Sequence, residues 1–295
     1  MSGEISYKVR EYDRGVFHPE TDKNFFVSKD HQRILEILDN LSTSSPQNMM
    51  LVGPQGCGKT ELAVWFAAQY NRPIIIMNCA TIREAKDWFG YRDAKDGSIF
   101  WHKSDFVRAL EMGNAVILLD EFNRLHTTLH NSLYSLLDAR RSAFLEELGE
   151  VVKVAPGTVF FATANIGFSH VGTFTMDSAM EDRWGLRLNV NFLPAEEEKK
   201  VLMQKIGINE ELASKLVKFA NDIRAKSSGT GATLDRAVST RQLLQTAQVA
   251  VQMALQGVSV TKAFDYTIIP FYSDDGGRES EQAQILQLIQ GIFGS

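Results

Sequence analysis

The sequence contains little cysteine and no long apolar run. Two of its 295 residues are cysteines, Cys57 and Cys79, which is too few for a disulfide framework and typical of a reducing cytosol. No apolar stretch approaches the ~20 residues that a membrane helix requires. Residues 1–20 are polar and mixed in charge, so they lack the apolar block of a secretory signal. We therefore expect a cytoplasmic protein without a membrane span.

An excess of basic residues is also lacking. The chain has 31 Lys and Arg against 36 Asp and Glu, a formal net charge of −5. The chain as a whole therefore has no electrostatic footprint for binding nucleic acid, although a local basic surface stays open. Hydrophobic residues make up 44% of the sequence, which is enough for a full core at this length.

One glycine-rich segment carries the strongest functional signal. Residues 53–60 read G-P-Q-G-C-G-K-T and complete the pattern G-x-x-x-x-G-K-[ST] directly after the apolar run 48–52. Glycines adopt left-handed and crowded conformations, and such a loop turns backbone N–H groups toward a phosphate chain. We assign these residues to nucleotide binding: Gly53, Pro54, Gln55, Gly56, Cys57, Gly58, Lys59, Thr60 and Glu61.

Lys59 and Thr60 are the chemically active members of this loop. Lys59 is expected to reach the β- and γ-phosphates, and Thr60 to supply a hydroxyl to Mg²⁺. Residues 61–70 predict a helix whose positive N-terminus faces the anion. An accidental match would lack this order of strand, loop and helix. Cys57 could form a redox switch, but its position requires only a small uncharged residue.

A second apolar run, 115–119, ends in Asp120 and Glu121. A continuous apolar run is typical of a fully buried parallel strand. At its end, Asp120 can hold Mg²⁺, and Glu121 can polarise the water that attacks the γ-phosphate. Acidic residues also cap ordinary helices, and residues 122–140 have a helical pattern, but a cap does not explain the pairing with the phosphate loop. The predicted ligands are ATP and Mg²⁺, with Thr60 and Asp120 at the metal.

A third predicted strand, 158–163, is followed by Asn165, and here the chain resembles the AAA+ ATPases. In that family a polar residue at this place, called sensor 1, contacts the γ-phosphate or the attacking water, so the resemblance implies a catalytic role for Asn165. The segment E-D-R-W at 181–184 resembles the arginine-finger segment and implies that Arg183 acts on the nucleotide of a neighbouring subunit.

Two further segments carry the same resemblance. S-T-R-Q-L at 239–243 is similar to the sensor 2 segment that opens a lid helix, which implies that Arg241 approaches the γ-phosphate. Asn78 follows the predicted strand 73–77. It matches a polar residue that some members use to restrain the glutamate at the position of Glu121, which is called the Walker B glutamate.

The finer resemblance is to the MoxR group, which includes the cobaltochelatase subunit CobS, the gas-vesicle protein GvpN and the NorQ/CbbQ activators. It spans about residues 25–270. D-E-F-N-R at 120–124 resembles the group's D-E-[IF]-N-R, residues 96–110 look like its hairpin inserted in helix 2 and the helix that follows, and residues 143–154 read as a second hairpin.

This resemblance implies a ring, expected to be hexameric, in which ATP hydrolysis moves a lid and the two hairpins against a protein client. Members of the group often act with a partner that carries a von Willebrand factor A domain, and they remodel a protein or assist metal or cofactor insertion. The sequence shows no such domain, so the partner is expected to be a separate chain.

The pattern of predicted elements changes at 193–194. Before it, strands alternate with helices, which predicts a parallel sheet with helices on both faces, and after it the pattern is helical only. We predict an N-terminal extension at 1–24, an α/β nucleotide-binding domain at 25–193, an all-helical lid at 194–272, and a linker with a C-terminal helix at 273–295. The last core strand is expected at 188–192. The predicted helices after it are 195–206, 210–226, 240–256, 260–267 and 279–293.

Other functions stay open at this point. A nucleic-acid motor of the McrB type would need a basic surface facing the pore, and the net charge disfavours it. A non-processive ATP-dependent switch would turn over little ATP, but the intact Glu121 and a finger candidate speak against it. Three other arginines compete with Arg183 as the finger: Arg140, Arg141 and Arg187.

Two groups of side chains carry weaker signals. His126 and His130 have the spacing of two zinc ligands, but the glutamate of H-E-x-x-H and a third ligand are lacking, so we predict no zinc site. Five aromatic residues near the first hairpin either pack it onto its neighbour or grip a client: Trp88, Phe89, Tyr91, Phe100 and Trp101.

Overall fold

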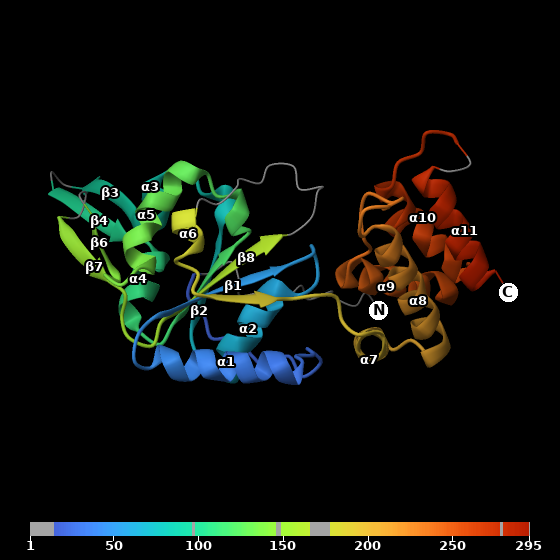
Figure 1. The fold of residues 1–295 in the computed structure, drawn as a ribbon, viewed down its shortest axis with the longest axis horizontal. Helices are drawn as coiled ribbons and strands as arrows, with labels where there is room; N and C mark the ends of the chain where they lie inside the picture. Colours follow the sequence, from blue (N-terminus) through green and yellow to red (C-terminus); the bar gives the residue numbers. More distant parts are fainter. Residues whose placement is uncertain (1–14, 96–97, 146–148, 166–177, 278–279, 295) are drawn as a thin grey trace.

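The computed structural model describes residues 15–95, 98–145, 149–165, 178–277 and 280–294, and it contains a sheet region followed by a helical region (Figure 1). The central sheet has five parallel strands in the order β2-β5-β8-β1-β9. The strands are β1 (Gln47–Gly53), β2 (Ile74–Asn78), β5 (Val116–Asp120), β8 (Val159–Asn165) and β9 (Leu186–Asn189).

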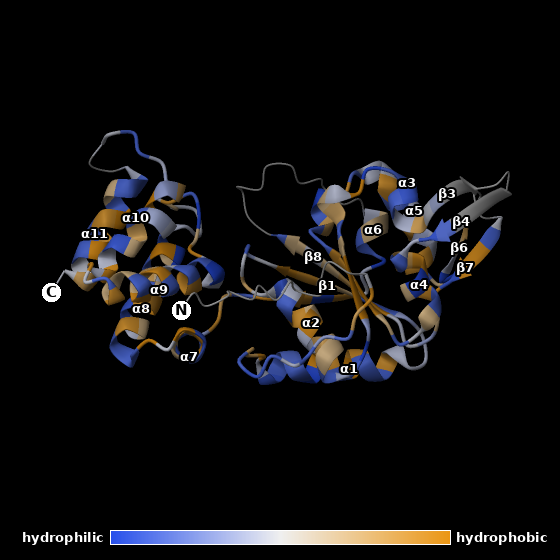
Figure 2. Ribbon diagram, turned by 180° about the vertical axis from the view of Figure 1, so that it is seen from behind, coloured by the Kyte–Doolittle hydropathy of each residue, from blue (hydrophilic) through white to orange (hydrophobic). Residues whose placement is uncertain are grey.

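Helices cover both faces of this sheet because the central strands are apolar on both sides. Met49 and Leu51 of β1 share one core with α1 (Lys29–Ser42) and α2 (Lys59–Gln69). Their neighbours Met50 and Val52 face a second core, with α4 (Asp105–Met112) and α5 (Thr127–Leu137). Figure 2 shows the hydrophobic residues gathered along β1 and β8. The expected α/β fold with a doubly covered parallel sheet is confirmed.

Both predicted hairpins are present and lie side by side, at the end of the sheet region that faces away from the helical region (Figure 1). The first pairs β3 (Gly90–Lys95) with β4 (Ser98–Lys103), and the second pairs β6 (Ser142–Leu145) with β7 (Glu150–Lys153). Lys103 of the first lies 3.4 Å from the carboxylate of Glu150 in the second. Residues 96 and 97 of the first hairpin lie outside the described residues.

The remaining short elements of the sheet region connect these parts. They are the α-helices α3 (Ala85–Phe89) and α6 (Ser178–Glu181) and the 3-10 helices η2 (Cys79–Thr81) and η3 (Phe122–Arg124). The expected helical pattern at 122–140 is therefore interrupted, because His126 is extended and caps α5, which begins at Thr127.

After the sheet, the chain forms helices around a separate hydrophobic core. These are α7 (Ala195–Ile206), α8 (Glu210–Lys226), α9 (Thr240–Leu255), α10 (Phe264–Thr267) and α11 (Glu281–Phe293), with the 3-10 helices η4 (Val260–Ala263) and η5 (Ile269–Phe271). Ile285 and Ile289 of α11 join the core formed by α8 and α9, so the last helix packs with the others. Within the described residues, no helix is both long and apolar enough to cross a membrane.

The last strand differs from its expected position at 188–192. β9 ends at Asn189, although the N–H of Val190 still donates to the carbonyl oxygen of Val52 in β1 at 2.8 Å. The carbonyl oxygen of Val190 accepts a hydrogen bond from Cys57 Sγ, and the ring of Phe192 lies against Arg224 of α8. Val190 therefore still belongs to the sheet region, whereas Phe192 contacts the helical region.

Candidate nucleotide-binding and hydrolysis site

The glycine-rich loop connects β1 to α2 with the backbone shape that its sequence predicts. Gly56 and Gly58 have φ angles of 72° and 96°, in the left-handed region that favours glycine. Gly58 caps α2, which begins at Lys59. The N–H groups of the first helical turn therefore face the loop, as in an anion-binding site.

Lys59 lies within this loop. Its side-chain Nζ donates to the carbonyl oxygens of Gly53 (3.0 Å) and Pro54 (2.7 Å), and the residue is 6% exposed. Burial of the ammonium group lowers the pKa of Lys59, an effect that the charge of Asp120 partly opposes. A buried cation of this kind favours an anionic ligand nearby.

Cys57 has a packing role in the loop. The residue is 8% exposed, and its Sγ donates to the carbonyl oxygen of Val190 at 3.0 Å. Burial raises the pKa of the Cys57 thiol. Because the thiolate is the reactive form of cysteine, this environment favours the packing role over a redox switch.

The hydroxyl of Thr60 joins the two halves of the predicted metal site. Thr60 Oγ1 donates to the carboxylate of Asp120, at 3.0 Å from Oδ1 and 3.2 Å from Oδ2. Thr163 Oγ1 donates to the same Oδ1 at 2.5 Å. Hydroxyl and carboxylate oxygens are ligands that suit Mg²⁺, so the donor set that meets here fits the predicted ion.

Glu121 follows Asp120 in an uncommon backbone conformation. Its φ and ψ are 54° and 42°, the left-handed region that costs a residue with a side chain roughly 1–3 kcal/mol and persists where the surroundings enforce it. The N–H of Glu121 donates to Thr163 Oγ1 at 2.8 Å. Its carboxylate lies 3.5 Å from the guanidinium of Arg124 and is 29% exposed. Glu121 thus stands at the edge of the site with a fixed backbone.

Asn165 ends β8, which lies between the strand of the phosphate loop and the strand of Asp120. In the strand register it is opposite Gly53, the first residue of the loop. The structure therefore brings Asn165 between the two predicted motifs. Asn78 is opposite Asp120 on the other side, where its side chain accepts a hydrogen bond from the N–H of Ala80 at 3.0 Å.

The start of α9 touches the phosphate loop. A methyl group added at Gly56 would lie 2.6 Å from Cβ of Ser239 and 3.9 Å from Cβ of Arg241. Ser239 caps α9 by accepting the N–H of Gln242 at 3.1 Å. The helical region therefore brings Arg241 to the loop, as the sensor 2 resemblance implies.

Arg183 lies at the amino end of the strands, opposite the end that carries the phosphate loop. Its carbonyl oxygen accepts a hydrogen bond from Nδ2 of Asn48, at 2.6 Å, near the beginning of β1. At about 3.3 Å per residue, Asn48 is about 17 Å from Gly53. Arg183 is therefore not at the phosphate loop of its own chain.

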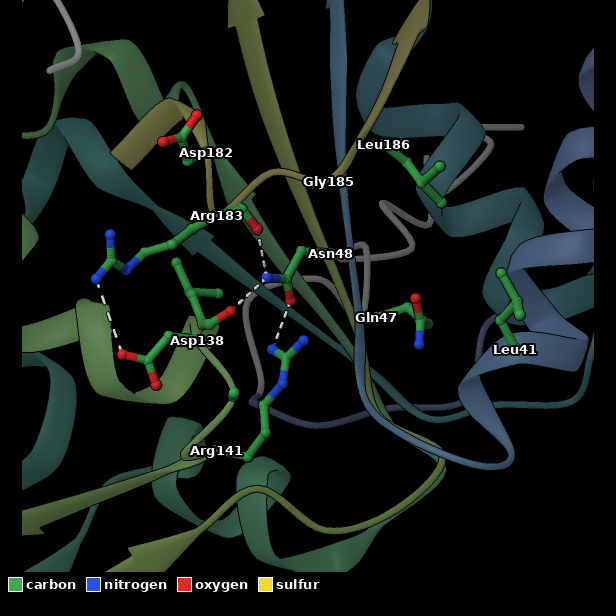
Figure 3. Close-up of a pocket in the computed structure, with 11 residues that line it drawn as sticks. Leu41, Gln47, Asn48, Asp138, Arg141, Asp182, Arg183, Gly185 and Leu186 are labelled. Carbon is green, nitrogen blue, oxygen red and sulfur yellow. Dashed lines mark hydrogen bonds and ion pairs between the residues drawn. The ribbon is translucent and has the colours of Figure 1, made fainter. Parts of the chain in front are cut away.

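Arg183 lines a pocket of about 540 Å³ (Figure 3). The guanidinium lies 3.8 Å from the carboxylate of Asp138 and 4.2 Å from the ring centroid of Tyr134, and its side chain is 22% exposed. The pocket is lined by Leu41, Gln47, Asn48, Leu137, Asp138, Ala139, Arg141, Asp182, Arg183, Gly185 and Leu186.

The competing arginines have different surroundings. Arg141 is held inside the fold, because its guanidinium donates to Oδ1 of Asn48 (2.7 Å) and the carbonyl oxygen of Pro46 (2.7 Å). Arg140 is exposed and pairs with Asp138 at 2.6 Å. Arg187 lies on the edge strand β9, opposite Met50 of β1, and is exposed.

The aromatic residues near the first hairpin differ in exposure, and the two histidines have structural contacts. Trp88 and Phe89 are 0% and 5% exposed and pack against Phe106, whereas Tyr91 is 60% exposed. Phe100 and Trp101 lie outside the residues whose side chains the structure describes. His126 caps α5, and the ring of His130 stacks on that of Phe122 at a centroid distance of 5.4 Å.

Sequence reasoning missed Thr163, whose hydroxyl contacts both acidic residues of the site. A signal was present, because Thr163 is a polar residue inside an otherwise apolar strand and lies two positions before Asn165. It also missed Asp138, which pairs with Arg183, because no local pattern connects a helix end to residues 45 positions away.

Comparisons with known proteins show the family and the fold. Residues 48–184 match the family model described as AAA domain (dynein-related subfamily), and residues 198–290 match the CbbQ/NirQ/NorQ C-terminal model. The chain is 32% identical over 230 residues to the candidate chaperone BssE of Thauera aromatica, covering 78% of each chain. It is 27% identical over 246 residues to NorQ of Paracoccus denitrificans, covering 83% of this chain and 86% of that protein.

Solved structures confirm the fold. The RuvB Holliday junction branch migration motor of Thermotoga maritima aligns with a TM-score of 0.57 and 17% identity, over 94% of this chain and 80% of that chain. The FIGL-1 AAA domain in complex with ADP aligns with a TM-score of 0.58 and 15% identity, over 95% and 94%. With both family models in the order that the fold shows, the chain belongs to the AAA+ ATPases of the MoxR group, with a C-terminal region of the CbbQ/NirQ/NorQ type.

Proposed function

We propose that the chain binds and hydrolyses ATP with Mg²⁺ at the carboxyl end of the sheet. The contact between Thr60 and Asp120 carries this proposal, because it joins the phosphate loop to the predicted metal carboxylate across 60 positions of sequence. Family membership and fold support the same activity.

Each residue of the site has a role in this proposal. The loop N–H groups and Lys59 hold the phosphates, since burial already favours an anion beside that ammonium group. Thr60 and Asp120 would hold Mg²⁺, which when bound neutralises charge that develops on the phosphates. Glu121 orients and polarises the attacking water, and Asn165 contacts that water or the γ-phosphate. Catalysis is then mainly positioning and electrostatic stabilisation.

Arg183 would complete the site of a neighbouring subunit. Its place at the amino end of the strands supports a role in trans, since the phosphate loop of its own chain is about 17 Å away along β1. The proposed assembly is a ring, with a hexamer as the expected number of subunits. Hydrolysis then depends on assembly, because each site lacks one cation until a neighbour supplies it.

The proposed output is movement against a client protein. Ser239 and Arg241, at the start of α9, lie beside Gly56 of the loop, so a change at the γ-phosphate would reach α9 directly. The proposed client work is remodelling, complex assembly, or insertion of a metal or cofactor, with a separate partner that carries a von Willebrand factor A domain. The similarity to BssE, which is named as a chaperone, supports a chaperone-like role, and the proposed location is the cytoplasm. The predicted domain division at 25–193 and 194–272 assigns chemistry to the first and the lid to the second.

Two variants of the site test the proposal. Lys59→Ala should abolish nucleotide binding, because Lys59 contacts phosphate in the ground state, whereas Glu121→Gln should keep binding and lose turnover. Titration with a fluorescent ATP analogue and a phosphate-release assay separate the two effects. Lys86→Ala is the matched control, since that lysine pairs with Glu84 on the surface. Equal loss of affinity in both site variants would contradict the assigned roles.

Client identity requires a separate experiment. Tagged Glu121→Gln protein with ATP should retain its client, because hydrolysis is blocked after binding. Co-purified protein would support the remodelling role, whereas co-purified nucleic acid together with ATPase stimulation by DNA would favour the motor.

A further inference from the structure

Thr163 occupies a position between the two acidic residues of the site. It belongs to β8, where Ala162 pairs with Leu119 of β5, so the next step of the register places Thr163 beside Asp120. The residue is 2% exposed. A hydroxyl group buried to this degree requires hydrogen-bond partners, and both of its partners belong to the proposed catalytic machinery.

The hydrogen bonds of Thr163 fix the direction of its hydroxyl proton. The N–H of Glu121 can only donate, so Thr163 Oγ1 accepts it at 2.8 Å. The single hydroxyl proton is then available to Asp120 Oδ1, at 2.5 Å. One oxygen atom therefore connects the backbone of Glu121 to the carboxylate of Asp120.

This connection explains how Glu121 keeps its conformation. Its left-handed backbone (φ 54°) is unusual for a residue with a side chain, and such conformations persist where neighbouring groups enforce them. The direction of the Glu121 side chain depends on this backbone. Loss of the Thr163 hydroxyl would leave the N–H of Glu121 without its partner and free the turn to change.

We propose that Thr163 is a positioning residue for ATP hydrolysis, which holds the carboxylates of Asp120 and Glu121 in one fixed relation. The proposal rests on the proposed function and adds a residue that neither predicted motif contains. Asp120 keeps its hydrogen bond from Thr60 without Thr163, so nucleotide binding should survive the loss of the hydroxyl. The effect should fall on the hydrolytic step, where small displacements of the attacking water matter most.

Substitutions at this one position provide the test. Thr163→Val replaces the hydroxyl with a methyl group of similar size, and Thr163→Ser keeps the hydroxyl. In Thr163→Val we expect kcat to fall about 10- to 100-fold, because a displacement of 1 Å can cost that much. The Kd for a fluorescent ATP analogue should change by less than about threefold, and Thr163→Ser should restore most of kcat. Thr163→Ala, which adds no methyl group beside Asp120, should behave like Thr163→Val.

Thr158 offers a matched control immediately before the other end of the same strand. It is 0% exposed, and its hydroxyl donates to the carbonyl oxygen of Ala155 at 2.7 Å. Thr158→Val removes an equally buried hydroxyl far from the site, so it should leave kcat unchanged. Circular dichroism and size-exclusion chromatography establish that each variant folds and assembles.

Each outcome decides the proposal. Wild-type kcat in Thr163→Val, or equal losses in Thr163→Val and Thr158→Val, would overturn it. If neither Thr163→Val nor Thr163→Ala folds, the hydroxyl serves stability and the proposal is also overturned. The wild-type chain and Glu121→Gln, measured in the same assay, distinguish failure of the proposed function from failure of the role of Thr163. Absence of ATP turnover in the wild-type chain refutes the proposed function itself, whereas a normal kcat in Thr163→Val, beside lost turnover in Glu121→Gln, refutes the role of Thr163 alone.

Discussion

The sheet region and the helical region each contain an inward-facing carboxylate, and the two have different hydrogen-bond partners. The hydrogen bonds to Asp120 come from the hydroxyls of Thr60 and Thr163. In contrast, Glu198 of α7 is 0% exposed and forms a bidentate pair with Arg224 of α8, at 2.7 and 2.8 Å. Hydroxyl partners leave the charge of Asp120 in place for a cation, whereas the guanidinium compensates that of Glu198 within the fold.

The pair in the helical region also determines where α9 begins. Thr240 Oγ1 donates to Glu198 at 2.6 Å, and Arg224 Nε donates to the carbonyl oxygen of Val238 at 2.9 Å. Arg224 lies 4.1 Å from the ring centroid of Phe192, in the segment between β9 and α7. The comparison indicates that the first region keeps its charges available for a ligand, while the second uses them to fix its own geometry. Substitutions should therefore affect rate in one region and stability in the other.

The largest effect is expected in the sheet region, on rate alone. Arginine fingers contribute roughly 10³- to 10⁵-fold in rate, so Arg183→Ala should nearly abolish turnover while ATP binding and the melting temperature stay close to wild type. Phosphate release, titration with a fluorescent ATP analogue and thermal melting would measure the three properties. Arg140→Ala is the matched control, because that exposed guanidinium pairs with the same Asp138. Near-normal turnover in Arg183→Ala would transfer the role to another arginine.

The second effect is expected in the helical region, on stability. Glu198→Gln leaves the charge of Arg224 buried without its partner, which typically costs about 3–5 kcal/mol. Urea unfolding, followed by hydrogen exchange in α7 and α8, would measure the loss. Glu196→Gln changes an exposed residue of the same helical turn and should leave stability unchanged. A stable Glu198→Gln protein would remove the distinction between the two regions.

The smallest effect is expected where the regions meet. Arg241 lies beside Gly56, and its loss should reduce the difference between the ATP-bound and ADP-bound states of the helical region. A ligand shifts an equilibrium only by its different contacts with the two states. Hydrogen exchange over residues 195–269 with each nucleotide would measure that difference. If Arg241→Ala leaves the difference intact, another group reports the nucleotide state.

Much of the fold could be predicted because its signals are local. The bounds of α7 and α8 agree with the expected 195–206 and 210–226, since Gly207 ends the first helix and Asn209 caps the second. β1, β5 and β8 each contain a run of apolar residues, and their bounds differ from expectation by one or two residues. β9 was shifted, because Phe192 continues the apolar pattern although its partner Arg224 lies in the helical region.

The contacts that support the site could not be predicted in the same way. Glu196, Glu197 and Glu198 all occupy the first turn of α7, and nothing local shows that Glu198 alone is buried among them. Its partner Arg224 comes from another helix, 26 positions away. The phosphate loop could be identified from the sequence because its pattern occupies eight consecutive residues. The pairing of Glu198 with Arg224 depends instead on how the helices pack.

Mixed rings test most directly the central claim, that one chain supplies the acidic residues and its neighbour supplies Arg183. Arg183→Ala subunits keep an intact phosphate and metal site, and Glu121→Gln subunits keep an intact arginine. Phosphate release is measured for each variant alone and for rings shown to contain both. We predict that the mixture recovers turnover that neither variant has alone, at interfaces where the first variant's site meets the second variant's arginine. Mixed rings that stay as inactive as the separate variants, or near-normal turnover by Arg183→Ala alone, would contradict the account.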